Sequence, residues 1–312
     1  MGWRSVVIAN PAELTVHDRA LSVTQGGNTA RVMLEDINVL VLEHGQISIT
    51  SSLLSACAEA GVAVLTVNAS HLPNGALLPY LPHSRGLKVM TAQLALPQPD
   101  RKRLWQRIVQ FKISNQASNL SQAGKAEEAR QLEQLARNVR SGDPDNNEAK
   151  AAQIYFRGLF GPQFNRNQQR FYNAALNYGY AVVRGALARS LVGYGFLPAF
   201  GLFHHSEQNA FNLADDLIEP YRPFVDAGVM AHFPEEPHDD LEPADKPKLV
   251  SLLHGDITLS SHSGNDGHCT LLAAVEATVS GLSAIVLQDE SHERLALPRM
   301  NFDRDEPFNP AQ

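Results

Sequence analysis

The sequence predicts an α+β protein, with a small β-rich domain over residues 1–84 and a larger, all-helical domain over residues 85–297. Two observations lead to this prediction. Short apolar runs separated by turn residues fill the first 84 residues, and long segments with helical spacing begin after Arg85. With 312 residues, 44% of them hydrophobic and 19% charged, the chain can bury a large core and lacks the composition of a disordered protein.

The β-rich domain is expected to contain six strands and one helix. Residues 51–61 carry apolar side chains at helical spacing and end in Gly61, which is placed like a C-cap. This helix should therefore cross over the sheet. Residues 72–86 contain three prolines and are expected to form a linker or turn. The expected strands span residues 5–8, 20–23, 30–34, 39–42, 47–49 and 63–67.

The second domain is expected to consist of helices whose ends are marked by glycine and proline. Gly124 separates two of them, and Gly161 and Pro162 follow another. Residues 234–247, rich in acids and prolines, should form an exposed loop, and residues 298–312 a loose tail. The expected helices span residues 88–95, 100–122, 125–140, 147–160, 168–191, 211–228, 249–253 and 271–287.

The net charge of −7 hides a strong asymmetry along the chain. Residues 85–189 contain 17 Lys and Arg against 7 Asp and Glu, whereas the rest of the chain is acidic. Solvated helical faces are often basic without binding anything. A basic block is also typical of a surface that follows a phosphate backbone, so the middle third motivates a DNA or RNA hypothesis.

The chain is expected to act in the cytoplasm and to have no membrane partner. No apolar run approaches the roughly 20 residues that a transmembrane helix needs, and the N-terminus lacks the features of a secretory signal. Cys57 and Cys269 are too few for a disulfide framework or a structural zinc site. We expect two buried free thiols in a reducing compartment.

The most unusual local group of acids and histidines lies between residues 203 and 223. On a helix that starts near Asn212, Asp216 and Glu219 are three residues apart, so their carboxylates should share one face. Two such carboxylates suit a cation, but from the spacing alone a pair of acids near a helix start, with Arg222 as salt-bridge partner, is the more common arrangement. His204 or His205 could approach from the preceding turn, and the spacing leaves the choice open.

Oxygen ligands with a single imidazole would favour Mg²⁺ or Mn²⁺ over Zn²⁺. Such ions serve phosphoryl transfer, where they neutralise charge on the phosphate. A second candidate, Glu148, begins an alanine-rich helix, where complementarity to the helix dipole is explanation enough on composition alone. Residues 173–180, polar and small, indicate close helix packing. The chain has no Walker loop, nucleophile elbow, paired CxxC or GxGxxG after a strand.

Several segments, taken together, resemble one known family. They are Gly2-Trp3-Arg4-Ser5-Val6-Val7, Asn147-Glu148 with Ile154-Tyr155-Phe156, Leu176-Asn177-Tyr178-Gly179-Tyr180, Gly201-Leu202-Phe203-His204, and Asp216-Leu217-Ile218-Glu219-Pro220-Tyr221-Arg222-Pro223. In order and spacing they are similar to the CRISPR-associated spacer-acquisition integrases, the Cas-one endonucleases, and above all to the version found beside the Cas-nine effector (type II). The resemblance spans nearly the whole chain.

Carried over position by position, the resemblance implies divalent-metal ligands at Glu148, His204 and Glu219, which would also be the catalytic residues, with Asp216 as a nearby acid. The adjacent His205 departs from the pattern and stays a second candidate for the histidine ligand. The resemblance further implies a β-sandwich-like N-terminal domain that forms a homodimer, and a helical domain that holds Mg²⁺ or Mn²⁺.

The activity implied by the resemblance is insertion of short DNA fragments into a CRISPR array as new spacers. A 3′-hydroxyl of the captured DNA would attack a phosphodiester at the end of a repeat, in a complex with the Cas-two protein and with effector-associated acquisition proteins. The basic middle third would then contact DNA. Two other hypotheses stay open: a stand-alone metal-dependent DNA nuclease with the same ligands, and a non-catalytic DNA-binding scaffold.

Overall fold

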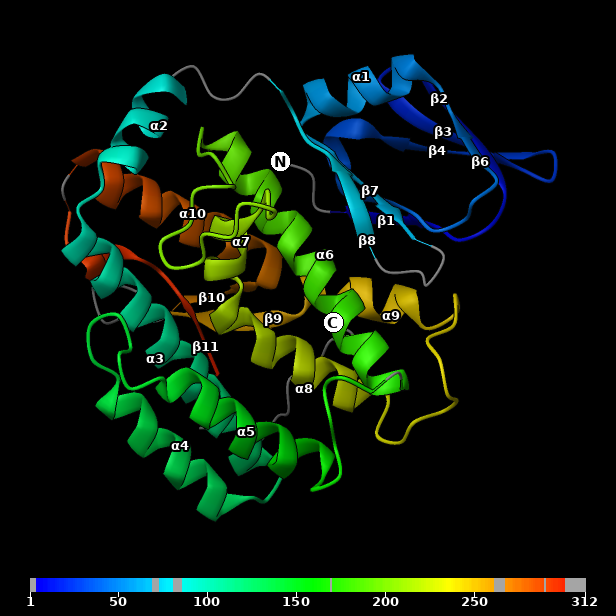
Figure 1. The fold of residues 1–312 in the computed structure, drawn as a ribbon. Coiled ribbons are helices and arrows are strands. Elements are labelled where there is room, and N and C mark those ends of the chain that lie inside the picture. The colour runs from blue at the N-terminus through cyan, green and yellow to red at the C-terminus, as the bar shows by residue number, and fades with distance from the viewer. Residues whose placement is uncertain are drawn as a thin grey trace.

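Two four-stranded sheets build the N-terminal part of the protein (Figure 1). The structure is a computed structural model and describes residues 4–68, 73–80, 86–168, 170–260, 267–288 and 290–300. In the first sheet, β1 (Arg4–Ile8), β5 (Ile37–Leu42) and β7 (Ala63–Val67) are parallel, and β8 (Pro73–Leu77) is an antiparallel edge strand. The second sheet has the order β4-β3-β2-β6, built from β2 (Ala12–His17), β3 (Ala20–Gln25), β4 (Asn28–Met33) and β6 (Ile47–Ile49).

A small core joins the two sheets and the helix α1 (Ser51–Ala60). It includes Leu14 and Leu21 of the second sheet, Leu40 of the first, and Leu53 of α1. The helix was expected and is confirmed: Thr50 Oγ1 accepts from the Leu53 amide at 3.3 Å, and Gly61 ends the helix at φ 73°. All six expected strands form. Two further strands, β2 and β8, were not predicted, and β8 lies within the residues that were expected to form a linker.

The C-terminal part is mainly helical but contains a small sheet, so the expectation of an all-helical domain was wrong in this detail. Strands β9 (Asp256–Leu259), β10 (Gly267–Thr270) and β11 (Pro298–Arg299) pair in the order β10-β9-β11. The helices are α2 (Gly86–Ala95), α3 (Gln98–Gln122), α4 (Ala126–Asn138), α5 (Asn147–Phe160), α6 (Phe171–Gly193), α7 (Asn212–Leu217), α8 (Arg222–His232), α9 (Lys246–Ser251) and α10 (Leu271–Gln288). Short 3₁₀ turns are η1 (Leu34–Asp36), η2 (Glu219–Tyr221), η3 (Leu252–His254) and η4 (His292–Arg294).

Two expectations near the end of the chain need correction. Residues 298–300 belong to the fold rather than to a tail, because Asn115 of α3 donates to the Pro298 carbonyl at 2.9 Å and accepts from the Met300 amide at 3.0 Å. The rest of the expected tail, residues 301–312, lies outside the described residues. Of the two free cysteines, Cys57 is buried as expected, whereas Cys269 is only partly buried.

The single helix expected over residues 211–228 is broken into α7, η2 and α8. Pro220 and Pro223 lack the amide hydrogen that a continuous helix requires, so a 3₁₀ turn that contains Pro220 separates α7 from α8, and Pro223 lies in the first turn of α8. The break matters because Glu219 lies at the start of that turn.

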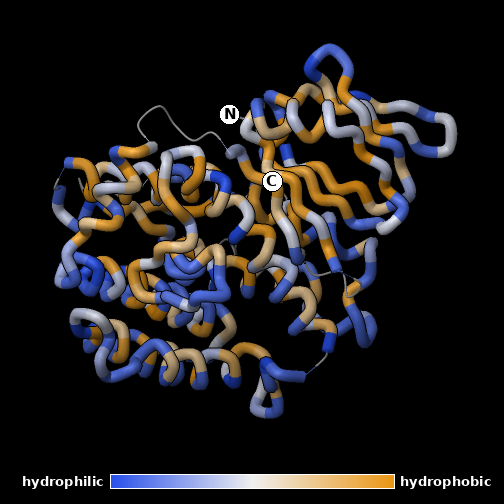
Figure 2. Tube along the Cα trace, turned by 45° about the horizontal axis from the view of Figure 1, so that its top comes forward, coloured by the Kyte–Doolittle hydropathy of each residue, from blue (hydrophilic) through white to orange (hydrophobic). Residues whose placement is uncertain are grey.

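The two parts of the chain share the larger core. Val39, Val41 and Leu65 of the first sheet belong to the same buried cluster as the helices, and α6 passes next to this sheet (Figure 1). Figure 2 shows the strands of the sheet as hydrophobic segments beside the helical part. The predicted boundary near residue 84 therefore separates two parts that pack on one another.

One helix in the described part of the chain, α10, is long and apolar enough to cross a membrane by length and composition alone. It lies against α6, α2 and β9, and its inward side chains, among them Leu271, Val275 and Leu282, are buried in the larger core. We therefore interpret α10 as a core helix.

Candidate active site

A buried lysine holds two of the expected site residues together. Lys112 of α3 donates a hydrogen bond from Nζ to Glu148 Oε1 and forms an ion pair with Glu219 Oε2. Its side chain is only 7% exposed. Glu148 belongs to α5 and Glu219 to η2, so charged side chains from three separate elements meet at Lys112 Nζ.

The position of Glu148 is set at the start of α5. Asp143 accepts hydrogen bonds from the backbone amides of Asn147 and Glu148, both at 2.9 Å, and so satisfies amides that the first helical turn leaves free. Asn146, in the left-handed region at φ 52°, turns the chain into the helix. These contacts fix the first turn of α5, and with it the backbone that carries Glu148.

Glu219 is paired on both of its oxygens. Arg222, three residues further on, donates to Oε1 at 2.9 Å, and Lys112 contacts Oε2. Burial by itself would raise the pKa of this carboxyl, but Arg222 and Lys112 outweigh it and lower the pKa to about 2. Burial likewise opposes the charge on Lys112, yet Glu219 and Glu148 raise its pKa above the ordinary value. The three groups form a charged cluster in a mostly buried place.

His204 is oriented by Asp216. This buried carboxylate accepts from the backbone amides of Leu202, Phe203 and His204 and contacts His204 Nδ1 at 2.7 Å. The hydrogen bond with Asp216 raises the pKa of His204, although burial opposes the shift. Because Nδ1 is engaged, Nε2 is the nitrogen left to bind a ligand. A carboxylate behind an imidazole is the common arrangement around metal-binding histidines.

The predicted pairing of Asp216 with Glu219 on one helix face does not occur. Because the helix ends at Leu217, Asp216 turns toward the loop that carries His204, while Glu219 turns toward Lys112. The ordinary interpretation of Arg222 as a salt-bridge partner is confirmed. His205 is exposed and does not line the pocket described next.

A pocket of about 330 Å³ opens beside these residues. His204 and Glu219 line it together with Arg222, Tyr180 and Arg184. The Tyr180 hydroxyl donates to the buried Asp226, which also accepts from the Tyr155 hydroxyl at 2.9 Å. Burial raises the pKa of Asp226 to about 6, against the effect of both hydroxyls. This network holds the Tyr180 ring in the pocket wall, where the Arg222 guanidinium lies 4.5 Å from its centroid.

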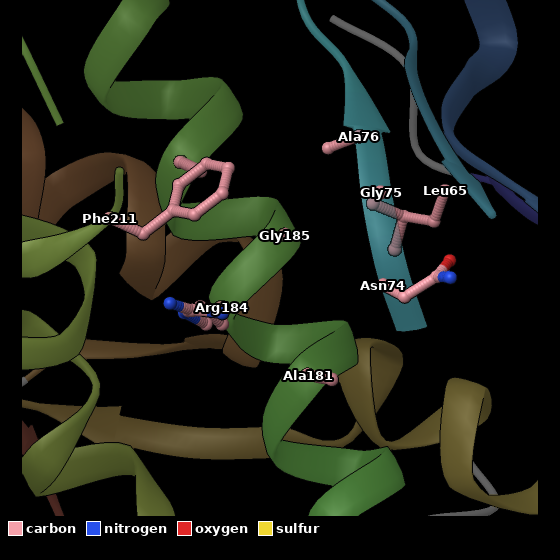
Figure 3. A pocket seen from close by; sticks show the side chains of 9 residues that line it. Leu65, Asn74, Gly75, Ala76, Ala181, Arg184, Gly185 and Phe211 are labelled. Carbon is pink, nitrogen blue, oxygen red and sulfur yellow. The ribbon is translucent and has the colours of Figure 1, made fainter. Parts of the chain in front are cut away.

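A second pocket, of about 210 Å³, adjoins the first and shares Ala181 and Arg184 with it. Figure 3 shows Arg184 and Phe211 on one side of this pocket and Asn74, Gly75 and Ala76 of β8 on the other. Arg184 lies 4.8 Å from the Phe211 ring centroid and pairs with Asp215 at 2.7 Å. The strand that the sequence did not predict, β8, therefore reaches the neighbourhood of the site.

The arrangement suits a divalent cation in its chemistry. In the described residues, no group of three or more His, Cys, Asp and Glu side chains lies close enough together to hold a metal ion. Two carboxylates nevertheless converge on one ammonium group, and an imidazole oriented by a carboxylate shares the pocket with one of them. Lys112 Nζ thus shows that a cation fits between Glu148 and Glu219, and this donor set matches Mg²⁺ or Mn²⁺.

Several residues of the site were missed in the sequence. Lys112 was counted only within the basic middle third, and residues 173–180 were interpreted as packing, although Asn177 and Tyr180 line the pocket. A signal for Lys112 was present: it interrupts the apolar face formed by Ile108, Val109 and Ile113. A lysine on such a face requires a charged partner.

The comparisons with known proteins point in one direction. The family described as CRISPR associated protein Cas1 matches residues 6–241. The CRISPR-associated endonuclease Cas1 of Neisseria meningitidis serogroup C (strain 8013) is 45% identical over 302 residues, which cover 96% of this chain and 97% of that protein. The CRISPR-associated endonuclease Cas1 2 of Pyrobaculum aerophilum is 27% identical over 74% of this chain and 83% of its own length.

Solved structures share the fold at low sequence identity. A casposase bound to its integration product has a TM-score of 0.75 at 16% identity, covering 99% of this chain and 96% of the casposase. A CAS1 protein from Thermotoga maritima has a TM-score of 0.70 at 12% identity, covering 91% of this chain and 97% of that protein. From the family match and the Neisseria relative, we conclude that this chain belongs to the Cas1 family.

Proposed function

We propose that this protein is a metal-dependent DNA integrase that inserts short DNA fragments into a CRISPR array as new spacers. The observation that carries the proposal is the convergence of Glu148 and Glu219 on a buried cation, beside an imidazole that Asp216 orients. The names of the relatives support it, because the Neisseria protein is called an endonuclease and the casposase was captured with an integration product.

Glu148, His204 and Glu219 are the residues that would hold Mg²⁺ or Mn²⁺. The chemistry that such an ion supplies is neutralisation of charge on the scissile phosphate. Arg222 keeps Glu219 ionised and aimed into the pocket, and Asp216 holds a proton on His204 Nδ1 so that Nε2 presents its lone pair. Of the two candidate histidines, only His204 lines the pocket, which favours it over His205.

The proposed reaction is a transesterification. The 3′-hydroxyl of the incoming fragment forms a new P–O bond at the repeat boundary, the old P–O bond breaks, and the departing strand keeps the 3′-hydroxyl. One phosphodiester bond is replaced by another of similar energy, so the reaction consumes no nucleotide cofactor. The pocket's Arg222 and Arg184 supply positive charge for the phosphate.

The proposed partners are DNA and a Cas2 protein. Solved relatives include a Cas6-RT-Cas1–Cas2 complex and a TtCas1–DNA complex. For DNA, we favour the surface of α3, α4, α5 and their connections, where Lys102, Lys125, Lys150 and Arg157 are exposed. Lys112 and Arg189, counted in the same basic third, are buried and cannot serve this purpose. We further propose a homodimer through the N-terminal sheets, contact with effector-associated acquisition proteins, and action in the cytoplasm.

The test is joining of a short DNA duplex to a supercoiled plasmid that carries a repeat, with the Cas2 protein and Mn²⁺ present. We expect joined products from the wild type and from His205→Ala, and none from His204→Ala, Glu148→Ala or Glu219→Ala. Nicking without joining by the wild type would favour a stand-alone nuclease. Undiminished activity of the glutamate variants would show that the site is wrongly placed, and DNA binding without any cleavage would favour a scaffold.

A further inference from the structure

The loop that carries His204 also presents an exposed aromatic ring. Phe203 is 42% exposed, although its ring stacks on that of Trp105 with centroids 4.3 Å apart and planes 1° apart. Trp105 itself is only 3% exposed. One face of Phe203 is therefore covered by a buried indole, and the exposure belongs to the rest of the ring. Large apolar rings are usually buried in proteins, so the exposure of the Phe203 ring suggests a binding role.

The ring is held rigidly. Gln93 of α2 donates to the carbonyls of Leu197 and Phe200 and accepts from the Leu197 amide, which fixes the first half of the loop. Asp216 accepts from the backbone amide of Phe203 itself at 3.1 Å. The exposure of Phe203 is thus built into the fold, because the backbone on both sides of the ring is tied to neighbouring helices.

The ring is also next to the proposed catalytic residues. The His204 ring stands edge-on to both Phe203 and Trp105, with centroids 5.6 Å away in each case. Along α3, Trp105 and Lys112 are seven residues apart, so they share a face and lie about 10 Å apart along the helix. A flat group on Phe203 and a phosphate near Glu148 and Glu219 can therefore belong to neighbouring nucleotides of one strand.

We propose that Phe203, backed by Trp105, is a stacking platform for an unpaired nucleobase of the DNA strand that occupies the catalytic pocket. The inference rests on the proposed function, since it assumes a DNA substrate. Nucleobases stack on exposed aromatic rings in many proteins that bind single strands, and this contact tolerates any base because each has a π-face. Phe203 would fix the strand at one nucleotide so that the adjacent phosphate lies beside His204.

The position of the Phe203 ring favours a DNA strand as its partner. The platform adjoins the pocket that His204 and Glu219 line, because the Phe203 ring contacts that of His204. Among the described residues, Arg101 on the same side of α3 donates to the backbone carbonyls of Leu96, Gln93 and Leu94 and to no carboxylate. Its positive charge therefore adds to the field that attracts a phosphate backbone. A neutral aromatic face beside positive charge is the combination that single-strand binding sites use.

The experiment measures whether Phe203 and one particular base act together. A duplex with a single-stranded 3′ overhang carries 2-aminopurine, or an abasic residue, at each overhang position in turn, and is bound by the full-length protein. In the wild type we expect quenching of 2-aminopurine at one position and about tenfold weaker binding when that position is abasic, the size expected for a lost base–aromatic stack. Phe203→Ala should bind both DNAs equally, and Phe203→Trp should restore the preference.

The controls separate this proposal from the proposed function. Tyr80→Ala removes an exposed aromatic ring from the segment that follows β8 and should keep the abasic penalty. If the abasic residue weakened binding equally in Phe203→Ala and in the wild type, the stacking proposal would be wrong. It would also be wrong if Phe203→Ala changed the oligomeric state but not the effect of the abasic residue, because the ring would then be a contact between protein chains. If plasmid joining proceeds normally in that case, the proposed function survives. If the wild type neither binds nor joins DNA, both proposals fail.

Discussion

At the scale of single residues, the most informative group is the Lys112 ammonium. A lysine with 7% of its side chain exposed is costly unless its charge is compensated, and here two carboxylates compensate it. In the proposed metal site, Lys112 and a divalent cation would compete for the oxygens of Glu148 and Glu219. Lysine thus keeps the two carboxylates together in the protein without metal.

This competition gives a prediction for Lys112→Met. The variant should be less stable than the wild type without metal, by on the order of 2 kcal/mol, because the buried Glu219 carboxylate loses one of its two cationic partners, Lys112 and Arg222. It should gain more from metal, since the competing ammonium is absent. Thermal unfolding with and without Mn²⁺ measures both effects, and we expect the rise in Tm on adding Mn²⁺ to be larger for Lys112→Met than for the wild type.

The matched control is Lys102→Met. It makes the same substitution on the same helix, at an exposed position, and should leave both the stability and the Mn²⁺ response close to those of the wild type. Equal Mn²⁺ responses in wild type and Lys112→Met would contradict the idea that the ammonium occupies the place of the metal.

At the scale of elements, α6 is the central helix, against which the first sheet and other helices pack. It contacts the first sheet on one side and α8 and α10 on the other (Figure 1), and it carries Tyr180 and Arg184 into the pocket. Gly179 allows the close approach of α8, since a Cβ added there would lie 2.5 Å from Val225 Cγ1. The interpretation of residues 173–180 as close helix packing is correct for Gly179, and incomplete for its neighbours.

Gly179→Ala should therefore destabilise the protein by about 1–3 kcal/mol, the usual cost of inserting a methyl group into a filled core. Because the displaced segment includes Tyr180, joining activity should fall as well. Gly193→Ala on the same helix is the control: nothing lies within 4 Å of a Cβ at that position, so its stability should be unchanged or slightly higher. Urea unfolding of the two variants compares them directly, and equal stabilities would show that α6 and α8 can separate at no cost.

The elements that the sequence predicted are those whose information is local. Helices α3 to α6 are long, with clear apolar spacing and glycine or proline at their ends, so their positions follow from nearby residues. Strands β9, β10 and β11 were missed because they have two to four residues and form by pairing with a partner. Strand β8 lies in a proline- and glycine-containing stretch that was interpreted as a linker, and β2 was overlooked although it has six residues. The pairing of Pro298 with Leu259, 39 positions away in the chain, leaves no local pattern.

The same difference applies to the site. Asp216 and Glu219 were found because they are close in sequence, but their predicted common face was wrong, since α7 ends at Leu217 and Glu219 begins the 3₁₀ turn η2. Glu148 was named as a second candidate that the helix dipole alone would explain, and its role as a metal ligand came only from the resemblance to a family. No spacing rule relates it to Glu219, because α3 supplies the lysine that joins them. The assignment of Glu148, His204 and Glu219 as metal ligands stays a prediction.

At the scale of the whole molecule, a second buried lysine ties the sheet part to the helical part. Lys246 of α9 is completely buried and pairs with Glu43, which directly follows β5. Tyr178 of α6 donates to the other oxygen of Glu43 at 2.6 Å. Three elements that are distant in the chain thus meet at one carboxylate, next to the core that both parts share.

Lys246→Met should therefore lower the free energy of unfolding by about 3–5 kcal/mol, because it removes the Lys246 ammonium from the buried Glu43 carboxylate. The double variant Glu43→Gln with Lys246→Met should recover part of this loss, since no charge then remains to be compensated, and the Tyr178 hydroxyl can still donate to the glutamine. Lys248→Met, an exposed lysine on the same helix, should cost less than about 1 kcal/mol. Urea unfolding followed by circular dichroism measures all three. If the double variant were as unstable as the sum of its single changes, the buried pair would not be what joins the two parts.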